Sequence, residues 1–96
     1  MTAAESFRLR VEGVFDLSER GTTVLGPILA GEVSIGDVLA VEGRETGPRA
    51  TCVGIDAAPR MLRTMKDALP RVGLTVTAWS RDDVAEGDVL VATERA

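Results

Sequence analysis

Residues 15–26 read FDLSERGTTVLG, a polar turn that joins two candidate strands. Upstream of this turn, apolar and charged residues alternate over Phe7–Glu12, and a period of two is typical of a half-buried strand. Downstream, Thr22–Ala30 is rich in β-branched and apolar residues, which also favours a strand. Pro27 cannot donate a hydrogen bond to a neighbouring strand, so we expect the second strand to bend or to lie at an edge near this residue.

Four more runs of apolar or β-branched residues, bounded by turn-forming residues, predict further strands: Val38–Val41, Ala50–Ile55, Gly73–Trp79 and Val89–Thr93. Gly13 interrupts the alternation of the first strand, and we expect a bulge there. The segment Met61–Leu69 also fits the spacing of a short helix. Short strands at intervals of roughly 8–12 residues, without a long helix, predict an all-β protein that forms a closed barrel or a sandwich.

Length and composition predict one globular domain, since the 96 residues are 45% hydrophobic and 27% charged. We expect a flexible N-terminus at residues 1–6, the β-barrel domain at 7–93 and a C-terminal tail at 94–96. The sequence has no apolar run long enough to span a membrane, its first residues lack the pattern of a signal peptide, and Cys52 is its only cysteine. These features lead us to expect a cytoplasmic protein that makes no contact with membranes.

The residue types that carry most enzymatic chemistry are scarce in this sequence. It has no histidine, which removes the usual general base and the commonest metal ligand, and it has no tyrosine. Cys52 therefore lacks an activating base, and the acidic residues within 82–88 do not have the spacing of a calcium-binding loop. Trp79 is a candidate for stacking on a nucleic-acid base, although a single Trp in a strand is more often half-buried. We expect no enzymatic activity, no metal and no cofactor.

The segment 15–26, followed by Gly31 and by Gly36-Asp37, resembles the second domain of elongation factor Tu and related translational GTPases. In that family the segment reads Phe, a short variable turn, Arg-Gly-Thr-x-Val-x-Gly, and then Gly-x-x-x-x-Gly-Asp or Glu. The similarity continues in order to the last predicted strand and covers about Phe7 to Ala92. The resemblance implies a six- or seven-stranded Greek-key β-barrel of the translation-protein type.

The GTP-binding domain of that family has no counterpart in these 96 residues. In translational GTPases the barrel follows a GTP-binding domain, whereas these 96 residues contain no Gly-x-x-x-x-Gly-Lys-Ser/Thr phosphate loop. The chain therefore resembles a stand-alone barrel detached from its GTPase, and we expect it not to bind GTP.

In elongation factor Tu this barrel helps to hold the aminoacylated end of tRNA. The resemblance maps that pocket onto Glu12, Phe15, Leu25, Asp56 and Arg71. Phe15 and Glu12 are retained, but Gly13 replaces a second acid, Leu25 replaces a Thr, Arg71 replaces an Asn, and Asp56 is a shorter acid than its counterpart. Most polar groups that would orient an amino acid are thus absent. We expect Phe15 and Leu25 to lie together, either as filled core or as a contact with another protein, a homodimer included.

A local group of bases stands out from a formal net charge of −4: Arg60, Arg63, Lys66 and Arg71. Two functions remain open. The first is a non-catalytic binding module that acts through protein contacts, which the overall acidity favours. The alternative is a translation accessory that binds tRNA or ribosomal RNA through this basic patch, with weak affinity that falls as salt rises. Clustering of the four bases on one face would favour the alternative.

Overall fold

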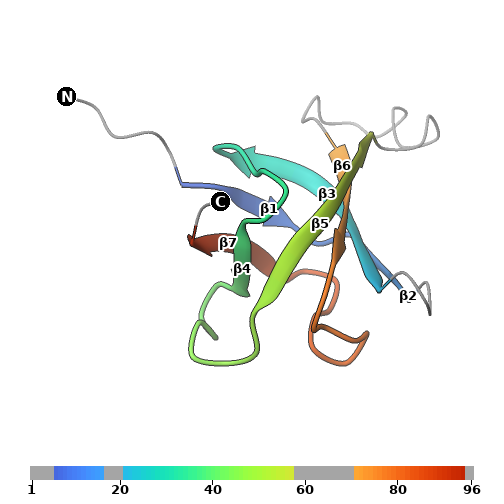
Figure 1. Ribbon diagram of the computed structural model, residues 1–96, viewed down its shortest axis with the longest axis vertical. Helices are drawn as coiled ribbons and strands as arrows, with labels where there is room; N and C mark the ends of the chain where they lie inside the picture. The colour runs from blue at the N-terminus through green and yellow to red at the C-terminus, as the bar shows by residue number, and fades with distance from the viewer. Residues whose placement is uncertain (1–5, 17–20, 58–70, 95–96) are drawn as a thin grey trace.

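The fold consists of β-strands in the part of the chain that the computed structural model describes, residues 6–16, 21–57 and 71–94. Seven strands follow one another along the chain (Figure 1). They are β1 (Arg8–Arg10), β2 (Gly13–Asp16), β3 (Thr22–Ala30), β4 (Val38–Val41), β5 (Ala50–Ala57), β6 (Arg71–Val76) and β7 (Val89–Glu94). Within these ranges there is no helix of the length and apolarity needed to cross a membrane. The candidate helix Met61–Leu69 lies outside the described residues.

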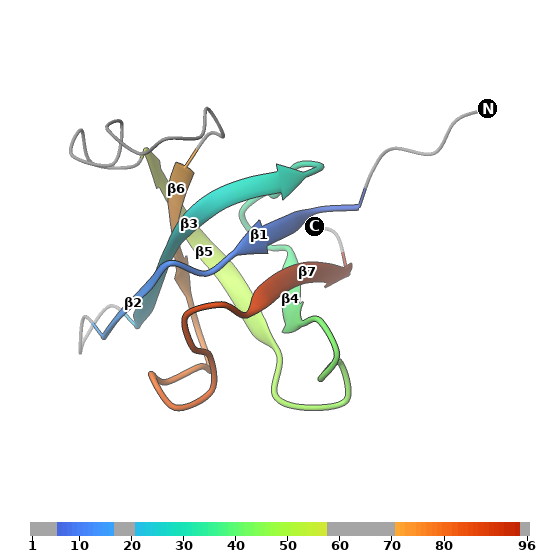
Figure 2. The same cartoon turned by 180° about the vertical axis from the view of Figure 1, so that it is seen from behind.

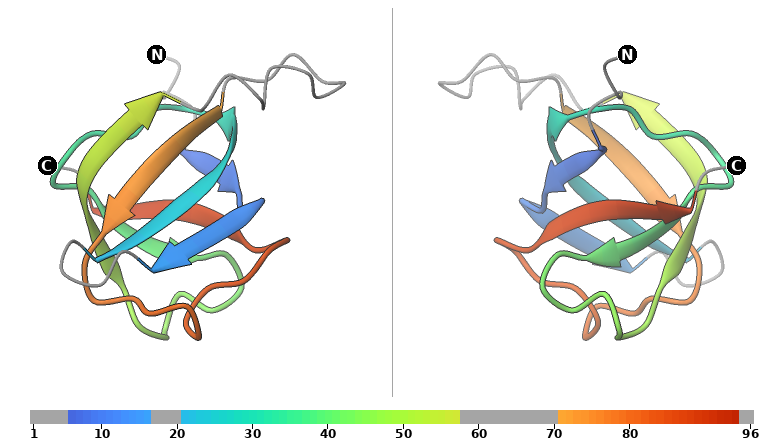
Figure 3. Two further views of the ribbon diagram at one scale, coloured as in Figure 1. Left: turned by 90° about the vertical axis from the view of Figure 1, so that its right-hand side faces the viewer. Right: turned by 90° about the vertical axis from the view of Figure 1, so that its left-hand side faces the viewer.

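The strands close into an antiparallel barrel. Six of them pair in the order β1-β7-β4-β5-β6-β3, and β1 also pairs with β3, which completes the circle. β2 is the extra strand, and among the described residues it pairs with β3 alone. Figure 3 shows the strands wrapped around a single interior. The predictions of an all-β chain and of a closed barrel are therefore confirmed.

Successive parts of β3 pair with β1 and β2. β2 pairs with the first part of β3, from Thr22 to Leu25, and β1 pairs with its last part, at Ile28 and Ala30. Pro27 lies between these two pairings, so neither β1 nor β2 requires a hydrogen bond from its nitrogen. β3 curves along its length as it passes from one partner to the other (Figure 2).

Gly26 is where the backbone of β3 crosses the junction of β1 and β2. The first predicted strand breaks between Arg10 and Gly13, and the amide of Glu12 donates to the carbonyl oxygen of Leu25 (2.8 Å). A Cβ atom on Gly26 would collide with the carbonyl oxygen of Arg10. Only glycine lets two backbones approach this closely, which explains its place in the sequence motif.

The side chains that point into the barrel form one hydrophobic core. Its buried members come from all parts of the described chain: Phe7, Leu9, Val11, Val24, Leu39, Val41, Ala50, Cys52, Leu74, Val76, Trp79, Val84 and Leu90. Thr22 is buried beside them, and its Oγ1 donates to the carbonyl oxygen of Trp79 (2.7 Å). The core lies within the domain predicted at residues 7–93, and β7 runs one residue further, to Glu94.

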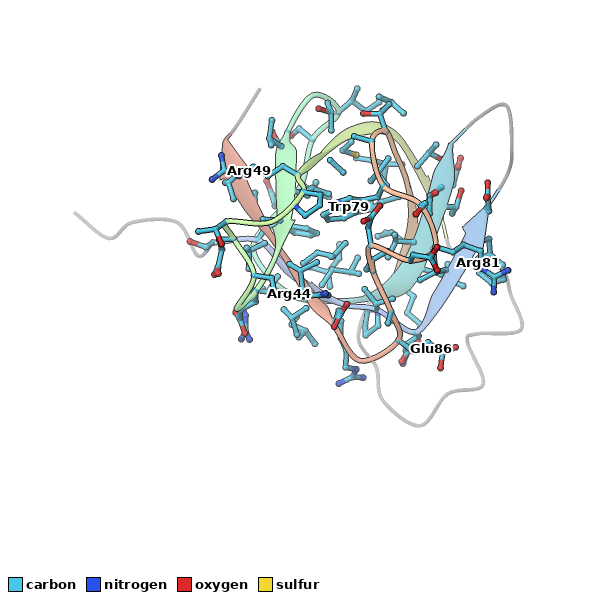
Figure 4. The ribbon with its side chains drawn as sticks, turned by 90° about the horizontal axis from the view of Figure 1, so that it is seen from below. Arg44, Arg49, Trp79, Arg81 and Glu86 are labelled. Atoms are coloured by element: carbon cyan, nitrogen blue, oxygen red, sulfur yellow. The ribbon has the colours of Figure 1, made fainter. Side chains whose placement is uncertain are left out.

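Trp79 closes one end of the barrel instead of continuing a strand. β6 ends at Val76, and Ala78 has a φ of 71°, a left-handed conformation that is incompatible with extended strand pairing. The indole is buried at the centre of the end view in Figure 4, and its Nε1 donates to the carbonyl oxygen of Pro48 (2.9 Å). The prediction that the strand reaches Trp79 is wrong, and this indole is not exposed for stacking on a base.

The close approach at Gly26 generates the first testable prediction. Gly26→Ala is expected to lower the free energy of unfolding by about 3 kcal/mol or more, because the added methyl group meets backbone that cannot move without breaking the strand pairing. Urea unfolding followed by the fluorescence of the buried Trp79 measures this change.

Gly43→Ala is the matched control. Gly43 has a positive φ of 88° but no atom within 4 Å of a built Cβ. This substitution carries only the conformational cost of alanine, roughly 1–2 kcal/mol. If Gly26→Ala and Gly43→Ala lowered the free energy of unfolding equally, this result would contradict the close approach at Gly26.

Candidate functional site

The candidate site is the outward-facing surface of β2, β3, β6 and β5, which we call the outer face. Val24 and Leu74 point into the core, so the residues that alternate with them along β3 and β6 point outward. Strand pairing aligns the outward residues in two rows, Phe15, Thr23, Thr75 and Gly54 in one, and Gly13, Leu25, Gly73 and Asp56 in the other.

Glycines form the floor of the outer face. A Cβ built on Gly13 would lie 3.1 Å from Cε2 of Phe15 and 4.0 Å from Cβ of Leu25. A Cβ built on Gly73 would lie 3.6 Å from Cδ1 of Leu25. The side chains of Phe15 and Leu25 therefore lie side by side over positions that carry no side chain of their own. The sequence predicted that these two residues are neighbours, and this prediction is confirmed.

Phe15 and Leu25 give the outer face an apolar character that remains open to solvent. Phe15 is 50% exposed, and Leu25 is half-buried and does not belong to the core. Beside them, the hydroxyl groups of Thr23 and Thr75 share a hydrogen bond across β3 and β6 (3.4 Å). Phe15 and Leu25 together form an apolar surface that is a candidate contact for another molecule.

A bidentate ion pair borders the outer face. Nε and Nη2 of Arg71 donate to Oε1 and Oε2 of Glu12, at 2.9 and 3.1 Å. The Arg71 side chain is only 4% exposed, and Nη2 of Arg10 lies 3.5 Å from Oε2 of the same carboxylate. The hydrogen bond from Arg71 lowers the pKa of Glu12, and the charge of Arg71 and the contact with Arg10 act in the same direction. This paired arrangement links the start of β6 to the junction of β1 and β2.

All five residues of the predicted pocket lie on this side of the barrel. Phe15, Leu25 and Asp56 are members of the outer face, and Glu12 and Arg71 form the ion pair at its border. The basic patch is different. Arg71 is buried against Glu12 instead of being exposed as a surface cation, and Arg60, Arg63 and Lys66 lie outside the described residues.

Val53 and Ile55 are exposed apolar residues that the sequence analysis did not single out. The pairing of β5 with β6 shifts register between Cys52 and Gly54, which leaves Val53 in an irregular, exposed position. Ile55 pairs beyond this shift and is also exposed. The one signal for the irregularity was Gly54, because an isolated glycine inside a strand indicates a bulge.

The remaining candidates have structural roles. Burial raises the pKa of the Cys52 thiol, whose Sγ lies 3.6 Å from the carbonyl oxygen of Gly54. The carboxylate of Asp83 accepts the Ser80 amide (2.8 Å), and that of Asp88 accepts the Ala85 amide (2.9 Å). Within the described ranges no group of three acidic, cysteine or histidine side chains is placed to hold a metal ion. Asp83 and Asp88 thus cap turns of this loop.

No protein-family model matches the chain. The likeness to translational GTPases therefore rests on the motif residues of the sequence, and the geometry of the outer face carries the functional argument.

The ion pair at the border generates the second prediction. Glu12→Gln is expected to lower the free energy of unfolding at pH 7 by about 2–3 kcal/mol, because Arg71 stays buried and loses its charged partner. The pKa of Glu12 is lowered in the folded state, so the contribution of the pair is fully present above the ordinary value of 4.5 and is lost as pH falls through the lower folded-state pKa. The difference between wild type and variant should therefore shrink in acid, as measured by urea unfolding at several pH values.

Glu42→Gln provides the control, since Glu42 pairs with Arg8 at the surface, where both side chains are largely exposed. Removal of this pair is expected to change stability by less than about 1 kcal/mol. A Glu12→Gln variant as stable as the control at pH 7 would show that the Arg71 pair contributes little.

Proposed function

We propose that this chain is a cytoplasmic, non-catalytic binding module, a β-barrel of the elongation factor Tu second-domain type that acts through protein contacts on its outer face. The observation that carries the proposal is the half-exposed ring of Phe15 beside Leu25, on a surface with a floor of glycines. Such a surface offers an aromatic anchor for a protein partner.

Charge favours a protein partner over nucleic acid. The described residues carry twelve carboxylate side chains and six arginines. One of these arginines, Arg71, is buried in its pair with Glu12. Binding to nucleic acid depends largely on neutralisation of phosphates by exposed bases, which this surface does not favour.

The motif residues support the translation-protein type of barrel. Gly36 has a φ of 99°, in the turn that leads to Asp37, and Gly26 packs against the backbone of Arg10. Each motif glycine thus occupies a position that another residue would strain or block. These roles support the fold type and leave the partner to the outer face, because a fold does not by itself define a function.

The third prediction concerns the partner. Leu25→Asp is expected to remain folded and to lose the bound partner, because Leu25 is on the outer face and a charge there opposes an apolar contact. Tagged wild type and variant, incubated with lysate from the source cells with and without RNase, would be compared by mass spectrometry of the retained proteins.

Ile35→Asp is the control, because it introduces the same charge at another site. Ile35 is 61% exposed and lies in the turn between β3 and β4. Proteins lost with Leu25→Asp but retained with Ile35→Asp are partners of the outer face. If RNase removes every retained protein, the RNA-binding alternative through Arg60, Arg63 and Lys66 replaces the proposal.

The fourth prediction concerns nucleotides. Because the sequence has no phosphate loop, titration calorimetry with GTP or ATP is expected to show no binding. A micromolar dissociation constant for GTP would contradict the expectation.

A further inference from the structure

We propose that the unpaired edge of β2 is a docking site for an extended basic segment of a partner protein, which adds to β2 as a further strand. This inference deepens the proposed function and rests on it, because it names the kind of protein segment that the outer face receives.

One edge of β2 is open in the described part of the chain. Among the described residues β2 pairs with β3 alone, while β1 and β3 close the barrel without it. Within residues 6–16, 21–57 and 71–94, no strand therefore pairs with the other edge of β2. A strand edge of this kind presents backbone amides and carbonyls that an extended segment satisfies by pairing.

The same edge carries an aromatic anchor. Phe15 lies on β2 itself, half-exposed, and its ring leans over Gly13 on the outer face. A strand that pairs with β2 brings alternate side chains onto the same face as Phe15. An apolar side chain at such a position would cover the ring.

The loop of residues 80–88, next to β2, is acidic. Val11, which follows β1, contacts the end of the 80–88 loop: its amide donates to the carbonyl oxygen of Asp88, and its carbonyl oxygen accepts from the amide of Gly87. The loop carries Asp82, Asp83 and Glu86 beside Arg81, and its fourth acid, Asp88, is paired with Arg44 (2.7 Å). Figure 4 shows Arg81 and Glu86 on the side of the barrel where β2 lies.

The negative charge of this loop favours a basic segment as the partner of β2. A second copy of the chain would bring the same acidic loop against its own copy, and like charges that face each other are destabilising. A segment with Lys or Arg beside apolar residues instead matches both the acidic loop and the ring of Phe15.

The test uses three short fluorescent peptides and the intact chain, with binding followed by fluorescence anisotropy at low salt. One peptide alternates Lys and Val, the second alternates Glu and Val, and the third is the Lys-Val peptide with every backbone nitrogen methylated so that neither edge can pair. The Lys-Val peptide is expected to bind, the Glu-Val peptide is not, and methylation is expected to weaken binding by about tenfold or more. In amide hydrogen exchange, the Lys-Val peptide should slow residues 13–16 of β2.

Phe15→Ala is expected to weaken binding of the Lys-Val peptide by about tenfold. Ile35→Ala removes an exposed apolar side chain elsewhere and should leave the binding of this peptide unchanged. Thermal melting establishes that both variants are folded. Equal binding of the methylated and unmethylated peptides, or no slowing of β2 exchange, would overturn strand addition. If the Lys-Val peptide does not bind while Leu25→Asp still loses a cellular partner, the edge proposal fails and the proposed function stands.

Discussion

The close contact between Gly26 and the carbonyl oxygen of Arg10 is the constraint on which the rest of the structure depends. It lets the chain leave β1 and continue as β2 beside an earlier part of β3. Because β1 and β3 then close the barrel, β2 is left with one partner, and the outer face extends beyond the closed circle of strands. Gly26 thus lies between the pairing that closes the barrel and the pairing that adds β2 to it.

The polar groups near this crossing are paired with one another. Arg71 spans from β6 to Glu12 at the junction of β1 and β2, and no side-chain polar atom buried in the described residues lacks a hydrogen-bond partner. A buried arginine without its carboxylate would be costly, so this pair holds the junction in place and removes Arg71 from the exposed cations. The outer face then presents Phe15 and Leu25 over glycines, with Thr23, Thr75 and Asp56 beside them.

The sequence predicted the elements that depend on local patterns. Alternation at Phe7–Glu12 and the turn glycines were sufficient for an all-β chain, and the motif placed Phe15 beside Leu25 correctly. It did not predict the end of β6, because the left-handed conformation of Ala78 depends on Trp79 packing under Pro48, which is far away in sequence. The burial of Arg71 and the register shift at Val53 were missed for the same reason, since both depend on which strands become neighbours.

The most direct measurement of this account is amide hydrogen exchange of the free, monomeric protein, resolved by residue. The account predicts that the amides of β3 exchange slowly along its whole paired length, whereas in β2 only those that face β3 are protected and their alternate neighbours exchange quickly. Slow exchange of every amide in residues 13–16 would mean that another segment already covers the edge of β2. That result would contradict both the open edge and the surface built on it.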